Sequence, residues 1–477
     1  MRKYFFGIDV GTQGVRVILV DQEGNNIASA SRKFVLDDKF REEQDPNIWW
    51  RDCLEIIDSI ISNLPADFDK QHIVAASVTS TSGTVIPLNN ANEPLHHAIM
   101  YSDGRSAEQG KRIREVALKH VPDGYTGFNA SSGISKMLWF VETYPQLKEE
   151  IALWIHASDF IVGKLSNQYA VTDYTNVLKS AFDLEKLSWP AYIFEEIGLK
   201  KEWMQKVVPS GTVVGQLNQE LAERWGIPSI DVVVGITDGC ASQMASGAVS
   251  PGDWNTTIGT TLVIKGVTHA QVIDPLGRLY SHRHPEGYWM PGGASNTGAD
   301  WISLDYQTDL NTLNKQAEEL IPTGELAWPL KQEGERYPIM APQARAIIPD
   351  NIDQETLYAA NLEGVAFIEK LAYEIIEELS SEKPTAVYTA GGGSNSDVWL
   401  SIRAAVLNVP IFKCQEASGA LGAAIMAASN THFSSLTEAA KAMTKVEKKV
   451  LPDTDLMKAY ELQYQYFKTK LKELKYI

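Results

Sequence analysis

One local pattern occurs twice in the sequence: a buried strand, a short Gly-Thr turn and a second buried strand. The first copy spans residues 5–21 and turns at Gly11-Thr12-Gln13-Gly14. The second spans residues 254–265 and turns at Gly259-Thr260-Thr261. Gly259 lies 248 positions after Gly11, which is about half of the 477-residue chain. A repeat at that distance predicts two domains with similar cores.

Length and composition agree with two large globular domains. Apolar residues make up 44% of the chain and charged residues 22%, so substantial cores can be buried. Ser250-Pro251-Gly252 marks a break before the second copy of the pattern, and we expect one domain over residues 1–247 and another over residues 248–477. In the second half, apolar residues recur in steps of three and four and predict a long helix over residues 355–379.

Charge and cysteine content exclude several classes of partner. The formal net charge of -17 argues against binding to nucleic acid or to an anionic membrane surface. The only cysteines, Cys53, Cys240 and Cys414, are too far apart for a disulfide framework, and no apolar signal core or long uncharged stretch occurs. A cytoplasmic protein is therefore expected. Its oligomeric state is left open, a homodimer included.

The first Gly-Thr turn has the composition of an anion site. Its glycines let the backbone approach a ligand, and successive turn amides can converge on an anion. Asp9, at the end of the preceding strand, is placed to face the same ligand through a metal ion, which suggests a phosphate and Mg²⁺ site. A purely structural hairpin explains the same residues, and no Walker-type Gly-Lys-Ser/Thr follows. The second copy of the turn favours the functional interpretation.

Two other stretches in the first half carry side chains suited to a polyol. A short apolar strand over residues 72–77 leads into a hydroxyl-rich run that contains Thr81, Ser82 and Gly83. Another strand leads into Asp103-Gly104-Arg105, which offers an acceptor and a donor for sugar hydroxyls. A polar turn and a surface ion pair are the alternatives, and these residues alone leave them open.

Asp238 and a triple-glycine turn each mark the passage from a strand to a helix. Asp238 follows a buried strand and enters a small-residue helix. It is either a helix cap or a carboxylate near the positive end of a helix dipole that deprotonates a hydroxyl. Gly391-Gly392-Gly393, with Asn395, precedes a helix that starts at Asp397. This turn is either a flexible loop or a backbone that approaches the phosphates or ribose of a nucleotide.

In this order and spacing, the motifs resemble those of the FGGY carbohydrate kinases. The resemblance covers nearly the whole chain, and its motifs are Asp9-Val10-Gly11-Thr12 with Arg16, Gln44-Asp45-Pro46 with Trp49-Trp50, Asp103-Gly104-Arg105, Thr237-Asp238-Gly239, Ile258-Gly259-Thr260-Thr261, Gly391-Gly392-Gly393 and Glu416-Ala417-Ser418-Gly419-Ala420. It implies an α/β protein with two ribonuclease-H-like (actin-like ATPase) domains, an active-site cleft between them, and ATP as the phosphate donor to a sugar hydroxyl.

The resemblance also implies roles for residues of several of these motifs. Asp238 is the expected catalytic base, and Asp9 is the expected Mg²⁺ partner with Asp238 beside it at the metal. The expected ATP contacts are Gly11, Thr12, Gln13, Arg16, Gly259, Thr260, Thr261, Gly391, Gly392, Gly393 and Asn395. The expected sugar contacts are Thr81, Ser82, Gly83, Asp103, Arg105 and Asp238.

The Thr81-Ser82 pair limits which sugars are expected as the substrate. D-xylulose kinases have a Met-His pair at this place and glycerol-type members an Arg-Glu pair, whereas Ser in a Thr-Ser-Gly-Thr setting resembles members that phosphorylate D-ribulose. We therefore expect a ketopentose, with D-ribulose ahead of D-xylulose. The alternatives are another substrate of the family, a hexulose or a polyol, and a non-catalytic sugar or nucleotide sensor of the same fold. Asp238 argues against the sensor, which would need no base.

Overall fold

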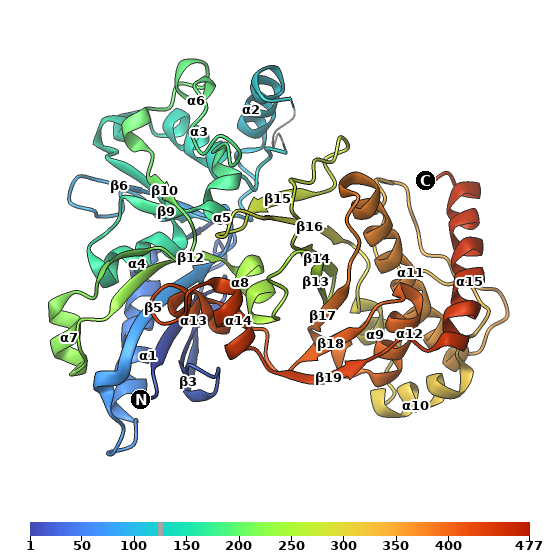
Figure 1. Ribbon diagram of the computed structural model, residues 1–477. Coiled ribbons are helices and arrows are strands. Elements are labelled where there is room, and N and C mark those ends of the chain that lie inside the picture. Colours follow the sequence, from blue (N-terminus) through green and yellow to red (C-terminus); the bar gives the residue numbers. More distant parts are fainter. Residues whose placement is uncertain (123–126) are drawn as a thin grey trace. The chain divides into compact units, whose positions relative to one another are not determined.

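The computed structural model describes residues 1–122 and 127–477, whose contacts form two compact units (Figure 1). Unit 1 comprises Met1–Ala245, His282–Gly287 and Ala417–Thr444, and unit 2 comprises Ser246–Ser281, Tyr288–Glu416 and Lys445–Ile477. The boundary that the sequence predicts between two domains, after residue 247, stays a prediction. The compact units add that the segment Ala417–Thr444 packs with the N-terminal half of the chain.

Unit 1 is built on a sheet with the strand order β11-β12-β5-β1-β2-β3. Its strands are β1 (Tyr4–Val10), β2 (Gly14–Asp21), β3 (Asn26–Lys33), β5 (Ile73–Ser80), β11 (Val213–Gln216) and β12 (Asp231–Thr237). Strands β1, β5 and β12 are parallel, and their registers pair Val10 with Ser80 and Ser80 with Thr237. The carboxyl ends of these three strands therefore meet at one edge of the sheet.

Helices cover both faces of this sheet. On one face, Phe6, Ile8 and Val10 pack with the buried side of α1 (Pro46–Ser62), and α4 (Ala157–Ser166) packs beside it. On the other face, α13 (Gly419–Ser429) contacts β1 and β5. A Cβ at Gly7 would lie 1.9 Å from the Ala420 carbonyl oxygen, so this helix packs directly on the strand backbone.

The remaining elements of unit 1 surround the central sheet. A smaller sheet has the order β4-β7-β6-β8, with β4 (Glu43–Gln44), β7 (Ala98–Ile99), β6 (Val85–Leu88) and β8 (Leu153–His156). Strands β9 (Val171–Asp173) and β10 (Lys206–Val208) form a pair. The other helices are α2 (Ala107–His120), α3 (Gly133–Thr143), α5 (Tyr174–Val177), α6 (Tyr192–Glu195), α7 (Gln219–Trp225), α8 (Asp238–Ala245) and α14 (Leu436–Met443).

Unit 2 repeats the strand–turn–strand design in its own sheet, with the order β15-β16-β14-β13-β17-β18-β19. The strands are β13 (Asp253–Ile258), β14 (Leu262–Gly266), β15 (Tyr280–Arg283), β16 (Trp289–Ser295), β17 (Ala386–Ala390), β18 (Ile411–Cys414) and β19 (Val446–Val450). As in the β1–β2 hairpin, β13 and β14 are antiparallel and close on a short turn. The predicted repeat is confirmed.

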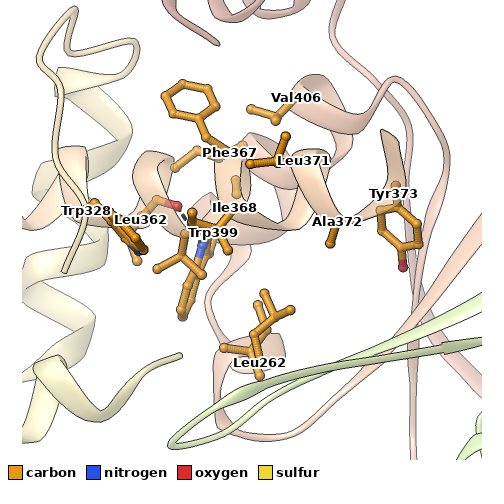
Figure 2. Close-up of a cluster of buried hydrophobic side chains, with 14 of the residues drawn as sticks. Leu262, Trp328, Leu362, Phe367, Ile368, Leu371, Ala372, Tyr373, Trp399 and Val406 are labelled. Atoms are coloured by element: carbon orange, nitrogen blue, oxygen red, sulfur yellow. Dashed lines mark hydrogen bonds between the residues drawn. The ribbon is translucent and has the colours of Figure 1, made fainter. Parts of the chain in front are cut away.

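The core of unit 2 lies around α11 (Gln354–Ser380), which confirms the long helix predicted over residues 355–379. Figure 2 shows Leu362 and Ile368 of this helix near Trp399, whose indole N–H donates to the Leu362 carbonyl oxygen (3.0 Å), and Leu371 beside Val406. Leu262, which follows the Gly259-Thr260-Thr261 turn, belongs to the same cluster. The other helices of the unit are α9 (Asp300–Asp305), α10 (Leu310–Leu320), α12 (Asp397–Leu407) and α15 (Thr454–Glu473).

No helix among the described residues has both the length and the apolar character needed to cross a membrane.

Candidate active site

Asp9 and Asp238 lie at the edge of unit 1 where the three parallel strands end. Asp9 is the next-to-last residue of β1, and Asp238 directly follows β12 as the first residue of α8. The Gly239 N–H donates to Asp238 Oδ1 (2.7 Å), which orients that carboxylate at the start of the helix. The sequence-predicted base and the predicted metal partner are therefore neighbours on one sheet edge.

The environment of Asp9 disfavours its charged form. Its pKa is raised to about 7, first by burial and second by the negative charge of Asp238, while the positive charge of Arg16 opposes the shift. Arg16 is the register partner of Asp9 on β2. On the α13 side, a Cβ at Gly419 would lie 2.6 Å from Asp9 Oδ2, so the carboxylate rests against that glycine.

This pair of carboxylates suits a hard cation. Carboxylate oxygens are ligands that Mg²⁺ prefers, and Mg²⁺ typically takes only one or two of them and completes its shell with water and phosphate oxygens. Among residues 1–122 and 127–477, no group of three or more His, Cys, Asp or Glu side chains is arranged to hold a metal ion. The donor set therefore fits an Mg²⁺ ion shared with a phosphate and does not form an all-protein cage.

The first Gly-Thr turn is anchored through its carbonyl oxygens. The Gly11 N–H donates to the Gly14 carbonyl (2.9 Å), and the Phe34 N–H donates to the Gln13 carbonyl (3.0 Å). The buried Gln44 amide donates to the Thr12 carbonyl (2.9 Å) and accepts the indole N–H of Trp49 (2.8 Å). Gln44 belongs to the Gln-Asp-Pro motif, to which sequence reasoning assigned no role; in the structure it supports the turn.

The second turn is anchored in the same manner in unit 2. The Gly259 N–H donates to the Thr261 carbonyl (3.0 Å), and the Gly259 carbonyl accepts the Ala299 N–H (2.7 Å). The triple-glycine turn is next to it: Gly391 has φ +87°, and a Cβ there would lie 2.7 Å from the Ile258 carbonyl oxygen. Gly392–Asn395 forms a 3₁₀ turn before α12. The structure thus brings together the nucleotide contacts that were predicted in the second half.

The predicted sugar contacts lie in two neighbouring loops of unit 1. Thr81 is buried and its hydroxyl shares a hydrogen bond with the Thr84 hydroxyl (2.9 Å), which also accepts the Tyr101 N–H (3.1 Å). Among the described residues, Ser82 Oγ is a buried hydroxyl that has no hydrogen-bond partner. A substrate hydroxyl beside Ser82 would therefore gain a hydrogen bond at little desolvation cost.

Asp103 and Arg105 are paired with each other. The Arg105 guanidinium donates from Nε and Nη2 to the buried Asp103 carboxylate (2.7 Å for Nη2–Oδ2), donates to Glu43 (2.6 Å) and stacks on the Trp139 ring (4.4 Å to the centroid). This is the ion pair that was the structural alternative for these residues. Their contact with a sugar stays a prediction.

The structure adds residues beside Gly83 that sequence reasoning missed. A Cβ at Gly83, which has φ +90°, would lie 2.3 Å from the Ser131 carbonyl oxygen and 3.2 Å from Lys179 Cδ. The buried Lys136 on α3 donates to the Ala130 carbonyl. Its neighbours in sequence, Ile134, Met137 and Leu138, are apolar. A lysine within such an apolar run is the feature of the sequence that could have indicated a buried functional residue. Ser131 and Lys179 therefore lie beside a loop that is predicted to contact a sugar, and Lys136 interacts electrostatically with Asp103 and Lys179.

A buried network supports the strand end before Asp238. The Thr237 N–H donates to Thr175 Oγ1 (2.8 Å), and that hydroxyl donates to Asp173 (2.7 Å), which has no exposed surface. Asp173 also accepts from the Ser210 hydroxyl (2.5 Å) and the Asn176 side chain (2.6 Å). Because all these donors converge on one carboxylate, the network fixes the position of Thr237. It thereby also fixes the position of the next residue, Asp238.

Comparison with known proteins identifies the family of this chain. The model of the FGGY family of carbohydrate kinases, N-terminal domain, matches residues 4–245, and that of the C-terminal domain matches residues 254–431. A gluconokinase of Bacillus licheniformis is 26% identical over 89% of this chain and 87% of its own, and a xylulose kinase of Bacillus subtilis is 24% identical over 98% and 96%. A solved xylulose kinase from Rhodospirillum rubrum superposes with a TM-score of 0.87 at 22% identity, covering 99% of both chains.

Members of the matched family are phosphotransferases that act on an alcohol group of a sugar. The chain belongs to the FGGY family of carbohydrate kinases and is an ATP-dependent sugar kinase. The predicted fold class, two actin-like, ribonuclease-H-like domains, is confirmed.

The buried Lys136 gives the stability of the protein a pH dependence. Burial lowers its pKa to about 7; the charge of Asp103 opposes the shift and that of Lys179 adds to it. Below pH 7 the Lys136 amine is protonated in both the folded and the unfolded state. The folded state then contains a buried ammonium group, which lowers the free energy of unfolding. Between about pH 7 and 10 the unfolded state binds more protons, so the stability of the wild type should rise relative to Lys136→Met.

Urea unfolding of the wild type and of Lys136→Met at pH 7 and pH 9.5 measures this difference. The matched control is Lys119→Met, which replaces an exposed lysine on α2. Its difference from the wild type should not change between the two pH values. A Lys136→Met difference that is equally flat would show that the Lys136 ammonium is not desolvated.

Proposed function

We propose that this kinase transfers the γ-phosphate of Mg²⁺-bound ATP to a hydroxyl of a small sugar, with Asp238 as the base. The observation that carries the proposal is that Asp9 and Asp238 lie together at one edge of the sheet. At this same edge, β1 leads into the Gly11-Thr12-Gln13 turn. Phosphoryl transfer needs positioning and charge neutralisation more than covalent chemistry, and these groups supply both.

Each residue of this set has a distinct task. Asp9 faces Mg²⁺, which when bound neutralises charge on the phosphates and lowers the pKa of nearby carboxyl groups. Asp238, held by the Gly239 N–H, accepts the proton of the attacking sugar hydroxyl. The two Gly-Thr turns contact the phosphates of ATP through backbone N–H groups, with Thr12 and Gln13 on the first turn. Arg16, on β2 directly after that turn, supplies a positive charge for the phosphates. The triple-glycine turn and Asn395 contact the nucleotide.

For the substrate, we propose a ketopentose. The relatives do not support the preference for D-ribulose that Thr81-Ser82 suggested, because their names are xylulose kinase and gluconokinase. D-xylulose therefore becomes the first ketopentose to test. The Ser82 hydroxyl, which is buried and has no hydrogen-bond partner among the described residues, is the group we propose for a sugar hydroxyl.

A second candidate substrate, D-gluconate, is favoured by the lysines beside Gly83. The Lys179 side chain passes along Gly83, and Lys136 lies close enough for the charge of Lys179 to lower its pKa. Positive charge next to a sugar site complements a substrate carboxylate, whereas a neutral ketopentose gains no charge pairing there. The relative named gluconokinase supports the same candidate.

Replacing the base should separate chemistry from binding. Asp238→Asn removes the proton acceptor at constant shape, so sugar-dependent ADP release should fall by about 10²-fold or more while ATP still binds. The matched control is Asp231→Asn, at the opposite end of the same strand, which should keep its turnover. Unchanged turnover in Asp238→Asn, measured with a coupled ADP assay, would show that Asp238 is not the base.

Replacing Lys179 should separate the two substrates. With D-xylulose and D-gluconate compared in the same assay, Lys179→Met should lower kcat/KM for gluconate by about tenfold or more, because an ion pair between substrate and site is lost. The value for D-xylulose should change by less than about threefold. An equal loss for both sugars would contradict a charge-specific role, and a wild type that does not phosphorylate gluconate would exclude the second candidate.

A further inference from the structure

Glu335 of unit 2 is a buried carboxylate in a dense set of hydrogen bonds. Only 3% of its surface is exposed. It accepts the Ser295 hydroxyl (2.7 Å), the Asn296 N–H (2.7 Å), the Thr297 hydroxyl (3.0 Å) and the Arg336 N–H (2.9 Å). Three of these four donors belong to residues 295–297, which are the last residue of β16 and the two residues after it. A buried charge that accepts this many donors fixes the conformation of the segment that carries them.

The segment held by Glu335 in turn holds the second Gly-Thr turn. The Thr297 carbonyl accepts the Leu262 N–H (2.9 Å), and the Ala299 N–H donates to the Gly259 carbonyl (2.7 Å). Between these two bonds, a Cβ at Gly298 would lie 2.3 Å from the Thr260 carbonyl oxygen, so the two backbones are in direct contact. The turn at residues 259–261 is therefore supported at both ends by residues 297–299.

Two tryptophans hold the same segment. The indole N–H of Trp328 donates to Thr297 Oγ1 (2.8 Å), and that of Trp301 donates to the Gly298 carbonyl (2.9 Å). Both rings are fully buried. Thr297 Oγ1 thus accepts from Trp328 and donates to Glu335, which makes the carboxylate the terminal acceptor of the chain of hydrogen bonds.

We propose that Glu335 is a positioning residue for ATP: through residues 295–299, it holds the Gly259-Thr260-Thr261 turn in the shape that binds a phosphate. The inference rests on the proposed function, in which this turn contacts the phosphates. A carboxylate is required because every group around it is a donor. A glutamine of the same size would set its NH₂ group against one or more of these N–H and O–H groups.

Glu363 provides a matched control in the same unit. It has no exposed surface, and its carboxylate accepts from the Thr323 N–H (2.9 Å), the Thr323 hydroxyl, the Tyr460 hydroxyl (3.0 Å) and the Gln463 amide (3.1 Å). Tyr460 and Gln463 connect α11 with α15, and Thr323 connects α11 with the segment that follows α10. Glu363→Gln therefore disturbs a buried carboxylate of similar connectivity at a place where no phosphate contact is proposed.

The experiment compares wild type, Glu335→Gln and Glu363→Gln by calorimetric titration with ATP in the presence of Mg²⁺ and, separately, with adenosine. Glu335→Gln should weaken ATP binding by about tenfold or more, as expected for a lost charge-assisted network, and change adenosine binding by less than about twofold. Glu363→Gln should leave the ATP affinity within about twofold of the wild type. In kinetics, Glu335→Gln should raise KM for ATP and leave KM for the sugar unchanged.

Two results would overturn the inference: equal ATP affinities for the two variants, or a parallel loss of ATP and adenosine binding in Glu335→Gln. If Glu335→Gln does not fold, Glu335→Asp keeps the charge with a shorter reach and has to show the same ATP-selective loss. A wild type that binds ATP but does not phosphorylate any sugar would overturn the proposed function alone, because the comparison of ATP affinities would still decide the role of Glu335.

Discussion

Two carboxylates of like charge, Asp9 and Asp238, lie together at the edge of a buried sheet. The strands and helices of unit 1 hold them in this position. Burial and the charge of Asp238 both disfavour ionised Asp9, which raises its pKa to about 7. Such a pair is unfavourable in an empty site and favourable around a divalent cation, since the cation neutralises both charges. The parallel register of β1, β5 and β12 produces the proximity, because it ends all three strands at one edge.

Close packing of backbones holds glycine-containing segments in place within each unit. Gly7 contacts α13, Gly298 contacts Thr260 and Gly391 contacts Ile258, each at a distance that leaves no room for a Cβ. A turn supported by backbone contacts and by a buried carboxylate such as Glu335 loses little entropy when it orders around a phosphate, because it is already in shape. Preorganised N–H groups of this kind act strongly on developing charge.

Local features of the site could be predicted from the sequence, and long-range ones could not. The two Gly-Thr turns, the helix around Val365 and Ile368, and the place of Asp238 between a strand and a helix follow from periodicity and turn chemistry within a few residues. Glu335 meets its partners about 40 positions away, and Ser131 approaches Gly83 only in the folded chain. D-ribulose was favoured from Thr81 and Ser82 alone, whereas the structure places Ser131 and Lys179 beside the next residue, Gly83. The two residues were therefore too small a part of the proposed sugar site.

We expect these groups to transfer phosphate to a sugar and not merely to bind nucleotide. Phosphorus NMR of the wild type with ATP, Mg²⁺ and a panel of ketopentoses, hexuloses, polyols and gluconate tests this expectation directly. With the true substrate, the γ-phosphate signal of ATP should be replaced by an equal amount of a sugar phosphomonoester, and without sugar the ATP signals should persist. Conversion of ATP to inorganic phosphate alone, or no conversion with any member of the panel, would contradict it.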